Sequence, residues 1–324
     1  MSKRGALEFK GGGPRVVALG GGHGLAATLR ALRRVTDQIT AVVGVADDGG
    51  SSGRLREQFG VLPPGDLRMA LAALCGDDTW GRTWSQVVQH RFSGEGDLGG
   101  HSLGNLLICA LWEQTNDPVI GLDWVGALLE AQGRVLPCST APIQIIADVQ
   151  GLNPTNPEHI VIVRGQVAVA TTPGTIVGIR IEPANAPVCE EAIEAVTRAD
   201  VIVLGPGSWY TSVLPHLLLP ELAVAITESM AKKIIVLNLD PKSDTEMSGL
   251  SVATHLGVLA DLVPDLTIDA VIADPGHVDD LGALTRSCER IGAELILNTL
   301  TYPRGTRLGE HDPDRLAVAM GSVL

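Results

Sequence analysis

Short apolar runs alternate with segments of helical periodicity along most of the chain. Arg15–Leu19 is typical of a buried strand, and Leu25–Val35 after it carries apolar residues at helical spacing. Repeated βα units predict an α/β fold: a Rossmann-like, doubly wound, mainly parallel sheet with right-handed crossovers. Further predicted strands are Ile39–Ala46, Val201–Leu204, Lys233–Leu239, Ala270–Ala273 and Glu294–Asn298. Further predicted helices are Asp66–Leu74, His101–Leu111, Glu190–Ala199, Val252–Leu262 and Asp279–Ile291.

Residues 133–185 interrupt this alternation. Short β-type runs crowd together there, separated by glycine and proline turns and by no helix, which predicts a local antiparallel unit. We therefore expect a single α/β domain over 15–324 with a β-rich excursion at 133–185, preceded by a flexible N-terminus over 1–14. The β-type runs are Val135–Cys138, Ile143–Val149, His159–Val163, Val167–Ala170 and Ile176–Ile181.

Composition narrows the class of protein. Aromatic residues make up only 3% of the chain, so Val, Ile, Leu and Ala must build the core, as is typical of buried parallel strands. The net charge of −13, with no basic run longer than Arg30–Arg34, disfavours nucleic acid and anionic lipid as partners. The chain has no apolar run of membrane-spanning length and no apolar signal-peptide core near Met1, which predicts a cytoplasmic protein. Five widely spaced cysteines indicate reduced, buried thiols.

The first unusual loop follows the first predicted strand. In an open parallel sheet, ligands sit outside the carboxyl ends of the strands, and glycine amides at a helix N-terminus suit a phosphate. Gly20-Gly21-Gly22-His23-Gly24 has this position, and Gly22-x-Gly24-x-x-Ala27 fits the loose dinucleotide fingerprint. The alternative is a tight βα turn without a ligand. The loop lacks the Lys and Ser/Thr of a Walker motif.

The second unusual loop, Asp47–Arg54, ends the second predicted strand. Asp47 and Asp48 are candidates to hold ribose hydroxyls or a hydrated Mg²⁺. Ser51 and Ser52 add hydroxyls, and Arg54 adds a positively charged fork. A solvated turn with an aspartate helix cap is the alternative.

Asp66 stands where an N-cap of the second predicted helix is expected, and capping alone is one explanation for it. The functional interpretation places it beside Asp47 and Asp48 as a third carboxylate, which together form a candidate metal site. Arg68 is then available to a phosphate or to Asp66.

Two later loops complete the candidate site. His101 or Ser102 is a candidate cap of the next helix, whereas Asn105 stands in apolar surroundings where a buried amide needs partners such as a sugar or base. Gly205-Pro206-Gly207-Ser208 follows the strand VIVL and predicts a second anion site, with a rigid capped turn as the alternative.

Five strings in this order, GGGHGL, VADDGGSSGRLR, PPGDLR, GGHSLGNLL and LGPGSWYTSVLP, resemble the YvcK-type gluconeogenesis factors. These factors share a superfamily with the CofD-type 2-phospho-L-lactate transferases, and the resemblance covers Arg15 to Asn298. It implies a Rossmann-like fold that binds UDP-N-acetylglucosamine, and a regulatory role in cell-wall synthesis and cell shape on gluconeogenic carbon sources. It also implies a membrane Ser/Thr kinase and cell-wall regulatory proteins as partners.

The resemblance carries over to the residues of these loops. His23 departs from the threonine of many members, and Asn238–Met247 replaces a segment that usually contains Pro-Gly-Glu-Thr. The matching residues are Gly21, Gly22, Gly24, Asp47, Asp48, Ser51, Ser52, Arg54, Asp66, Arg68, His101, Ser102, Asn105, Gly205, Gly207 and Ser208.

Three functions follow from these observations. The first is a nucleotide-sugar-binding regulator without turnover. The second is a transferase of deazaflavin coenzyme synthesis, in which Asp47, Asp48 or Asp66 holds Mg²⁺. The third is an NAD(P)-dependent oxidoreductase, for which the chain lacks a Tyr-x-x-x-Lys pair. Catalytic residues and the oligomeric state stay open, and a homo-oligomer is compatible with the sequence.

Overall fold

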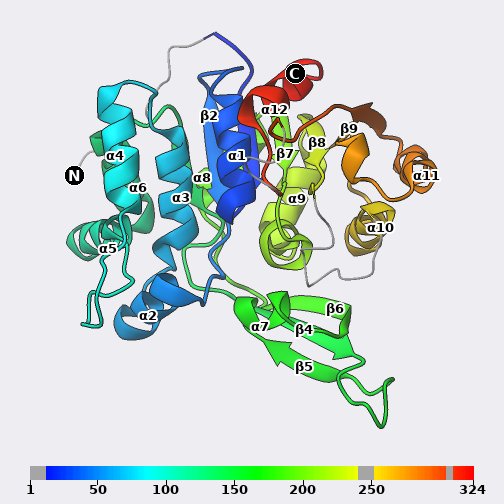
Figure 1. The fold of residues 1–324 in the computed structure, drawn as a ribbon, viewed down its shortest axis with the longest axis horizontal. Coiled ribbons are helices and arrows are strands. Elements are labelled where there is room, and N and C mark those ends of the chain that lie inside the picture. The colour runs from blue at the N-terminus through cyan, green and yellow to red at the C-terminus, as the bar shows by residue number, and fades with distance from the viewer. Residues whose placement is uncertain (1–11, 240–251, 304–308) are drawn as a thin grey trace.

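The computed structural model describes residues 12–239, 252–303 and 309–324, and its centre is a seven-stranded parallel sheet (Figure 1). The strand order is β10-β9-β8-β7-β1-β2-β3. This confirms the predicted Rossmann-like α/β architecture. The strands are β1 (Val16–Gly20), β2 (Ile39–Val43), β3 (Arg134–Pro137), β7 (Val201–Leu204), β8 (Lys232–Val236), β9 (Ala270–Ala273) and β10 (Glu294–Leu297).

The chain reverses its direction of winding between β1 and β7. It builds β1, β2 and β3 outward on one side, then crosses over and builds β7 to β10 outward on the other. Val16 therefore pairs with Ile39 in β2 and with Val201 in β7. Every residue of β1 and β7 is buried, which explains why these strands read as continuous apolar runs. The loops after β1 and β7 therefore flank the topological switch point, where ligands bind in such sheets.

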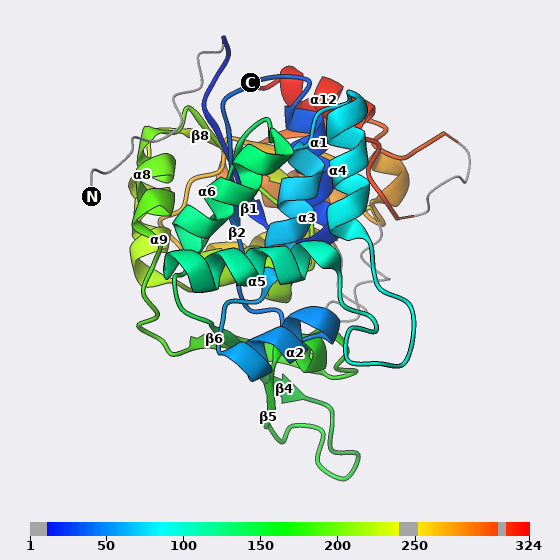
Figure 2. The same ribbon diagram turned by 90° about the vertical axis from the view of Figure 1, so that its left-hand side faces the viewer.

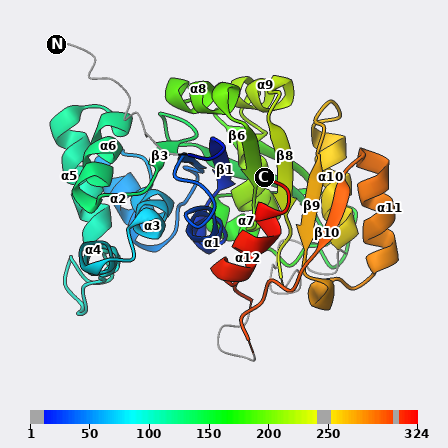
Figure 3. The ribbon, with the colours of Figure 1, turned by 90° about the horizontal axis from the view of Figure 1, so that it is seen from above.

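Helices cover both faces of the sheet. Helices α8 and α9 lie on one face, and α1 and α12 lie on the other (Figure 3). Helix α3 packs against α1, and α4, α5 and α6 pack with it at the β3 side of the molecule (Figure 2). The helices are α1 (Gly22–Leu32), α2 (Gly50–Phe59), α3 (Pro64–Leu74), α4 (Thr79–Gln89), α5 (Leu103–Thr115), α6 (Pro118–Leu129), α7 (Gln166–Ala170), α8 (Glu190–Arg198), α9 (Pro220–Glu228), α10 (Val252–Leu262), α11 (Leu281–Ile291) and α12 (Pro313–Gly321).

A second, antiparallel sheet has the order β5-β4-β6, with β4 at Gln144–Gln150, β5 at Val161–Arg164 and β6 at Thr175–Glu182. It lies beyond the end of the main sheet at which α2 and α7 are found (Figure 1). The predicted antiparallel unit is thus confirmed between Gln144 and Glu182.

Two of the five β-type runs were assigned wrongly. Val135–Cys138 falls on β3, which joins the main sheet parallel to β2, so its apolar residues serve the large core and not a local hairpin. Val167–Ala170 lies in the short helix α7, whose Val167 amide donates to the carboxylate of Asp48. Short apolar runs do not distinguish a strand from a helical turn, and here a distant side chain decides.

The glycine–serine stretch after β2 is also not the loop that we predicted, because Gly50 to Gly53 form the first turn of α2. Glycine and serine are poor helix formers. Gly53 is nevertheless required by packing, since a Cβ there would overlap the carbonyl oxygen of Asp48. A close local approach to the backbone just before α2 therefore explains why glycine is found within this helical turn.

All five cysteines are free and buried, as expected. Within the described residues, no single helix has the length and apolarity needed to cross a membrane. One pair of helices, Trp209–His216 and Pro220–Glu228, bent by 72° at the break between them, meets the length and composition criteria jointly.

Candidate functional site

The loop after β1 packs directly against the loop after β7. Gly24 faces the carbonyl oxygen of Pro206 so closely that a Cβ would overlap it, and the Thr28 hydroxyl donates to the Gly205 carbonyl at 2.9 Å. A Cβ at Gly207 would lie 4.0 Å from the carbonyl oxygen of Gly21. Gly24 of the loose dinucleotide fingerprint is therefore explained by contact between the two loops. His23, in contrast, is exposed on α1.

The loop after β7 is held by a residue that sequence reasoning did not select. The Asn238 side chain accepts from the Gly207 amide at 2.8 Å and donates to the Gly207 carbonyl at 2.9 Å. No regular α-helix follows Ser208, since Trp209–Val213 (η1) is a π-helix followed by the 3-10 turn Leu214–His216 (η2). Asn238 opens the segment Asn238–Met247 that departs from the family pattern, and residues 240–247 lie outside the described residues.

Asp66 links the start of α3 to the glycine loop after β1. The expected N-cap role is wrong, because Pro63 occupies that position and Asp66 lies in the first turn of α3. Its carboxyl group accepts from the Gly22 amide, and a Cβ at Gly21 would lie 2.5 Å from Asp66 Oδ2. The sequence-predicted phosphate loop is thus covered in part by an acidic side chain.

Burial beside Asp47 raises the pKa of Asp66 to about 7, although the Gly22 amide and the Arg68 guanidinium act in the opposite direction. Burial also lowers the pKa of Arg68 to about 10, with the nearby charge of Arg91 adding to the effect. Asp66 is therefore poised between its neutral and charged forms near neutral pH.

The two aspartates after β2 have different surroundings. Asp47 Oδ1 accepts from the Gly49 amide at 2.9 Å, and Asp47 Oδ2 lies 3.0 Å from where a Gly65 Cβ would stand. Asp48 instead faces the antiparallel sheet, with Oδ1 accepting from the Val167 amide at 3.0 Å. Asp47 and Asp66 thus interact across the site, whereas Asp48 reaches away toward α7.

The carboxylates do not form a ready-made cage. Among the residues that the structure describes, no group of three or more His, Cys, Asp or Glu side chains could hold a metal ion together. Mg²⁺ needs only one or two carboxylates when a substrate phosphate supplies other ligands, and Asp47 with Asp66 fits that requirement.

A buried hydrogen-bond network connects α2 to α5. The Ser51 hydroxyl lies 2.9 Å from His101 Nδ1 and accepts from Asn105 Nδ2 at 3.0 Å. Asn105 is only 1% exposed, so it does not face solvent. Ser52 Oγ accepts from the Gly65 amide at 3.0 Å, and Arg54 donates to the Gly99 carbonyl at 2.8 Å. Burial lowers the pKa of His101, with Arg54 and Arg91 adding to the shift, which favours the neutral ring.

Three buried polar atoms in this region have no hydrogen-bond partner among the described residues. They are Arg68 Nε, Ser102 Oγ and Asn105 Oδ1. Helix α5 begins at Leu103, two residues later than predicted, and Ser102 holds the N-cap position without making a side-chain cap bond. Arg68 lies beside these residues, since a Cβ at Gly104 would stand 2.8 Å from Arg68 Cγ. Buried polar atoms nearly always have partners, so a cluster of unpaired ones is a position where an ordered water, an ion or a ligand is expected.

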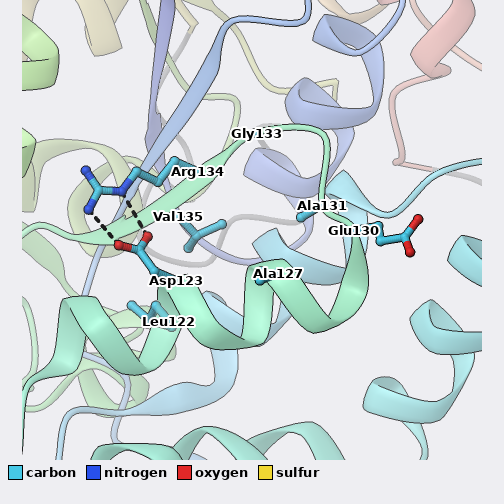
Figure 4. Close-up of a pocket in the computed structure, with 9 residues that line it drawn as sticks. Leu122, Asp123, Ala127, Glu130, Ala131, Gly133, Arg134 and Val135 are labelled. Atoms are coloured by element: carbon cyan, nitrogen blue, oxygen red, sulfur yellow. Dashed lines mark hydrogen bonds and ion pairs between the residues drawn. The ribbon is translucent and has the colours of Figure 1, made fainter. Parts of the chain in front are cut away.

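A cavity of about 180 Å³ lies elsewhere, between α6 and the first residues of β3 (Figure 4). Its lining is mostly apolar, and two of its charged residues form an ion pair, in which Arg134 donates to Asp123 at 2.9 and 2.8 Å. Because β3 starts here, this cavity is at the amino edge of the sheet, away from the loops described above.

The predicted site residues therefore meet at the carboxyl edge in a chain of contacts. Gly207 lies next to Gly21, Gly21 next to Asp66, and Asp66 interacts with Asp47. The α2 serines continue this chain to Asn105. His23 and Arg54 lie at its periphery, and Asp48 contacts α7.

Comparison with known proteins identifies the family of the chain. The family model for "2-phospho-L-lactate transferase CofD" matches residues 16–290. A relative from Mycobacterium leprae is 48% identical over 316 residues, covering 97% of this chain and 87% of the relative. The gluconeogenesis factor of Listeria monocytogenes is 36% identical over 321 residues, with 96% of each chain covered.

A solved structure shares the whole fold. The crystal structure of a UPF0052-family protein from Bacillus halodurans superposes with a TM-score of 0.83 at 31% identity, covering 95% of this chain and 99% of that one. The chain therefore belongs to the CofD-like family, together with the YvcK-type gluconeogenesis factors.

Proposed function

We propose that this protein binds a nucleotide sugar, UDP-N-acetylglucosamine, at the carboxyl edge of its parallel sheet and acts as a regulator without turning the ligand over. The regulated process is cell-wall synthesis and cell shape during growth on gluconeogenic carbon sources. The relatives named gluconeogenesis factors support the physiological context, and the sequence strings shared with YvcK-type factors support the ligand.

The observation that carries the binding proposal is the group of unpaired buried atoms on α3 and α5. Leaving a buried donor or acceptor unpaired costs about 1–3 kcal/mol each, so a fold retains such a group where something else pairs with it. Arg68 and Ser102 offer donors, and Asn105 Oδ1 offers an acceptor. A sugar nucleotide presents both kinds of partner, namely hydroxyls and amide N–H groups as donors and carbonyl or phosphate oxygens as acceptors.

Ligand-dependent unfolding tests this proposal. A ligand that binds only the folded state at about 100 times its Kd raises the free energy of unfolding by roughly 2.7 kcal/mol. We expect a rise in Tm with UDP-N-acetylglucosamine and none with GDP, GTP or NAD. No response to the UDP sugar at millimolar concentration would contradict the proposal. In cells, loss of the gene should disturb shape on a gluconeogenic carbon source and not on glucose.

The family model supports a second candidate, a Mg²⁺-dependent transferase resembling the 2-phospho-L-lactate enzymes. Asp47 and Asp66 would hold the ion, which would neutralise charge on a transferred phosphoryl group when bound. In that case Asp66 must be charged, so the positive charge of the bound ion would have to outweigh the burial and the neighbouring Asp47 that raise the pKa of Asp66 in the free protein. Product formation from a deazaflavin alcohol, dependent on Mg²⁺, would replace the regulator proposal with this one.

A further inference from the structure

The short helix α7 is capped by a residue far away in the chain. Gly165 occupies the N-cap position of this helix, and because it has no side chain it makes no side-chain cap bond. The Val167 amide instead donates to Oδ1 of Asp48, 119 residues earlier, at 3.0 Å. A side-chain oxygen on the first-turn amides is what an N-cap residue normally supplies.

The contact between Asp48 and α7 depends on glycine at two positions. Gly165 has φ +96°, and a Cβ there would overlap Asp48 Oδ2. On the other side, a Cβ at Gly49 would lie 3.0 Å from Val167 Cγ2. Because Gly49 and Gly165 have no side chains, the carboxylate of Asp48 and helix α7 can approach each other closely.

The same helix also reaches the other side of the site. Gln166 Nε2 donates to the carbonyl oxygen of Thr211 at 3.2 Å, and α7 packs against the π-helix η1 that follows Ser208. Helix α7 thus spans from the loop after β2 to the loop after β7, beneath the strand ends (Figure 1). Those two loops flank the glycine loop after β1.

From this geometry we infer that Asp48 is a positioning residue, which docks α7 and the antiparallel sheet across the carboxyl edge so that α7 forms one wall of the nucleotide-sugar site. The inference rests on the proposed function for the identity of the ligand. It assigns Asp48 a role different from that of Asp47 and Asp66: it accepts a backbone N–H and is not a ligand of Mg²⁺ or of ribose.

Two substitutions at Asp48 separate these roles. Asp48→Asn keeps an oxygen that accepts from the Val167 amide but removes the charge, whereas Asp48→Ala removes both. We expect hydrogen exchange at residues 166–171 to accelerate at least tenfold in Asp48→Ala and the Kd for UDP-N-acetylglucosamine to rise about tenfold. Asp48→Asn should remain within about threefold of the wild type in both measurements.

Gly165→Ala provides an independent test, because it pushes α7 away while leaving the carboxylate intact. It should reproduce the exchange and affinity of Asp48→Ala, and the double variant should be no worse than either single one, since both break the same contact. An unchanged Tm of the main transition serves as the control that the fold survives.

The inference is overturned if exchange at residues 166–171 is the same in Asp48→Ala and the wild type. It is also overturned if Asp48→Asn weakens binding as strongly as Asp48→Ala without changing exchange, which would indicate a charged ligand contact. If wild-type protein does not bind the UDP sugar at all, the proposed function fails and the wall assignment fails with it, whereas the exchange data still decide whether Asp48 docks α7.

Discussion

The two edges of the parallel sheet offer different kinds of candidate site. At the amino edge, the cavity beside α6 has volume, but its ion pair is complete, because Arg134 and Asp123 satisfy each other. At the carboxyl edge, glycine loops and helix starts are packed tightly together, yet Arg68, Ser102 and Asn105 each retain an unpaired buried atom. The difference teaches that unsatisfied polar groups, more than empty space, distinguish a recognition site from a packing gap.

Glycines at the two edges should respond oppositely to the same substitution, and this is the largest effect that we expect. Gly24→Ala forces a methyl group into the Pro206 carbonyl and should lower the free energy of unfolding by about 1–3 kcal/mol. Gly126→Ala, in α6 beside the cavity, meets only an ordinary contact with Leu71 and should raise it by about 0.5–1 kcal/mol. Urea unfolding of both variants measures the difference, and equal changes of one sign would contradict the comparison.

Removing an unpaired atom should affect binding more than stability. Asn105→Ala deletes the unpaired acceptor and one hydrogen bond to Ser51, so we expect the Tm of the free protein to change little and the Kd for UDP-N-acetylglucosamine to rise at least tenfold. Arg134→Ala is the matched control at the other edge. It should lower stability by leaving Asp123 unpaired but keep the Kd unchanged. If the Kd rises in Arg134→Ala and not in Asn105→Ala, the ligand binds in the cavity beside α6 and not at the carboxyl edge.

The smallest effect concerns the charge of Asp66. Its pKa rises from 3.8 to about 7 on folding, so between these values the folded protein holds a proton that the unfolded chain has released. The free energy of unfolding should therefore fall as pH rises through this window, with the full penalty present above pH 7. Asp66→Asn should be more stable than the wild type at pH 8 by about 1 kcal/mol or more, because its amide carries no charge that would have to be buried.

Below pH 4 the two proteins should be equally stable with respect to this group, because Asp66 is then neutral in both the folded and the unfolded chain. Thermal unfolding from pH 4 to pH 8 provides the measurement. A wild type that gains stability over the Asn variant with rising pH would show that Asp66 is stabilised in its charged form.

The main sheet was predictable because its strands are buried on both faces and read as apolar runs, and Val201–Leu204 and Ala270–Ala273 are found with the predicted bounds. The sequence failed where packing decides the local structure. The α7 residue Val167 is capped by Asp48, 119 residues earlier, and Gly53 in α2 approaches the Asp48 carbonyl more closely than any side chain would permit. No pattern within either segment contains that information.

The candidate site was predictable as a set of loops but not as a set of contacts. Spacing indicated that the loops follow strands, and the strand ends do meet at one edge. It did not indicate that Asp66 turns toward Gly22 or that Asn238 holds Gly207, because both depend on side-chain direction across separate elements. Asn238 offered one signal, since it is a polar residue near the end of the otherwise apolar predicted strand Lys233–Leu239, and the observed β8 ends before it, at Val236.

The crossover from β3 to β7 has one more consequence. Helix α8 alone is enough to carry the chain from one half of the main sheet to the other, so the antiparallel sheet between residues 144 and 182 is surplus to that topology. The two sheets are therefore separate units of topology, and the contact of Asp48 with α7 is one of the links between them.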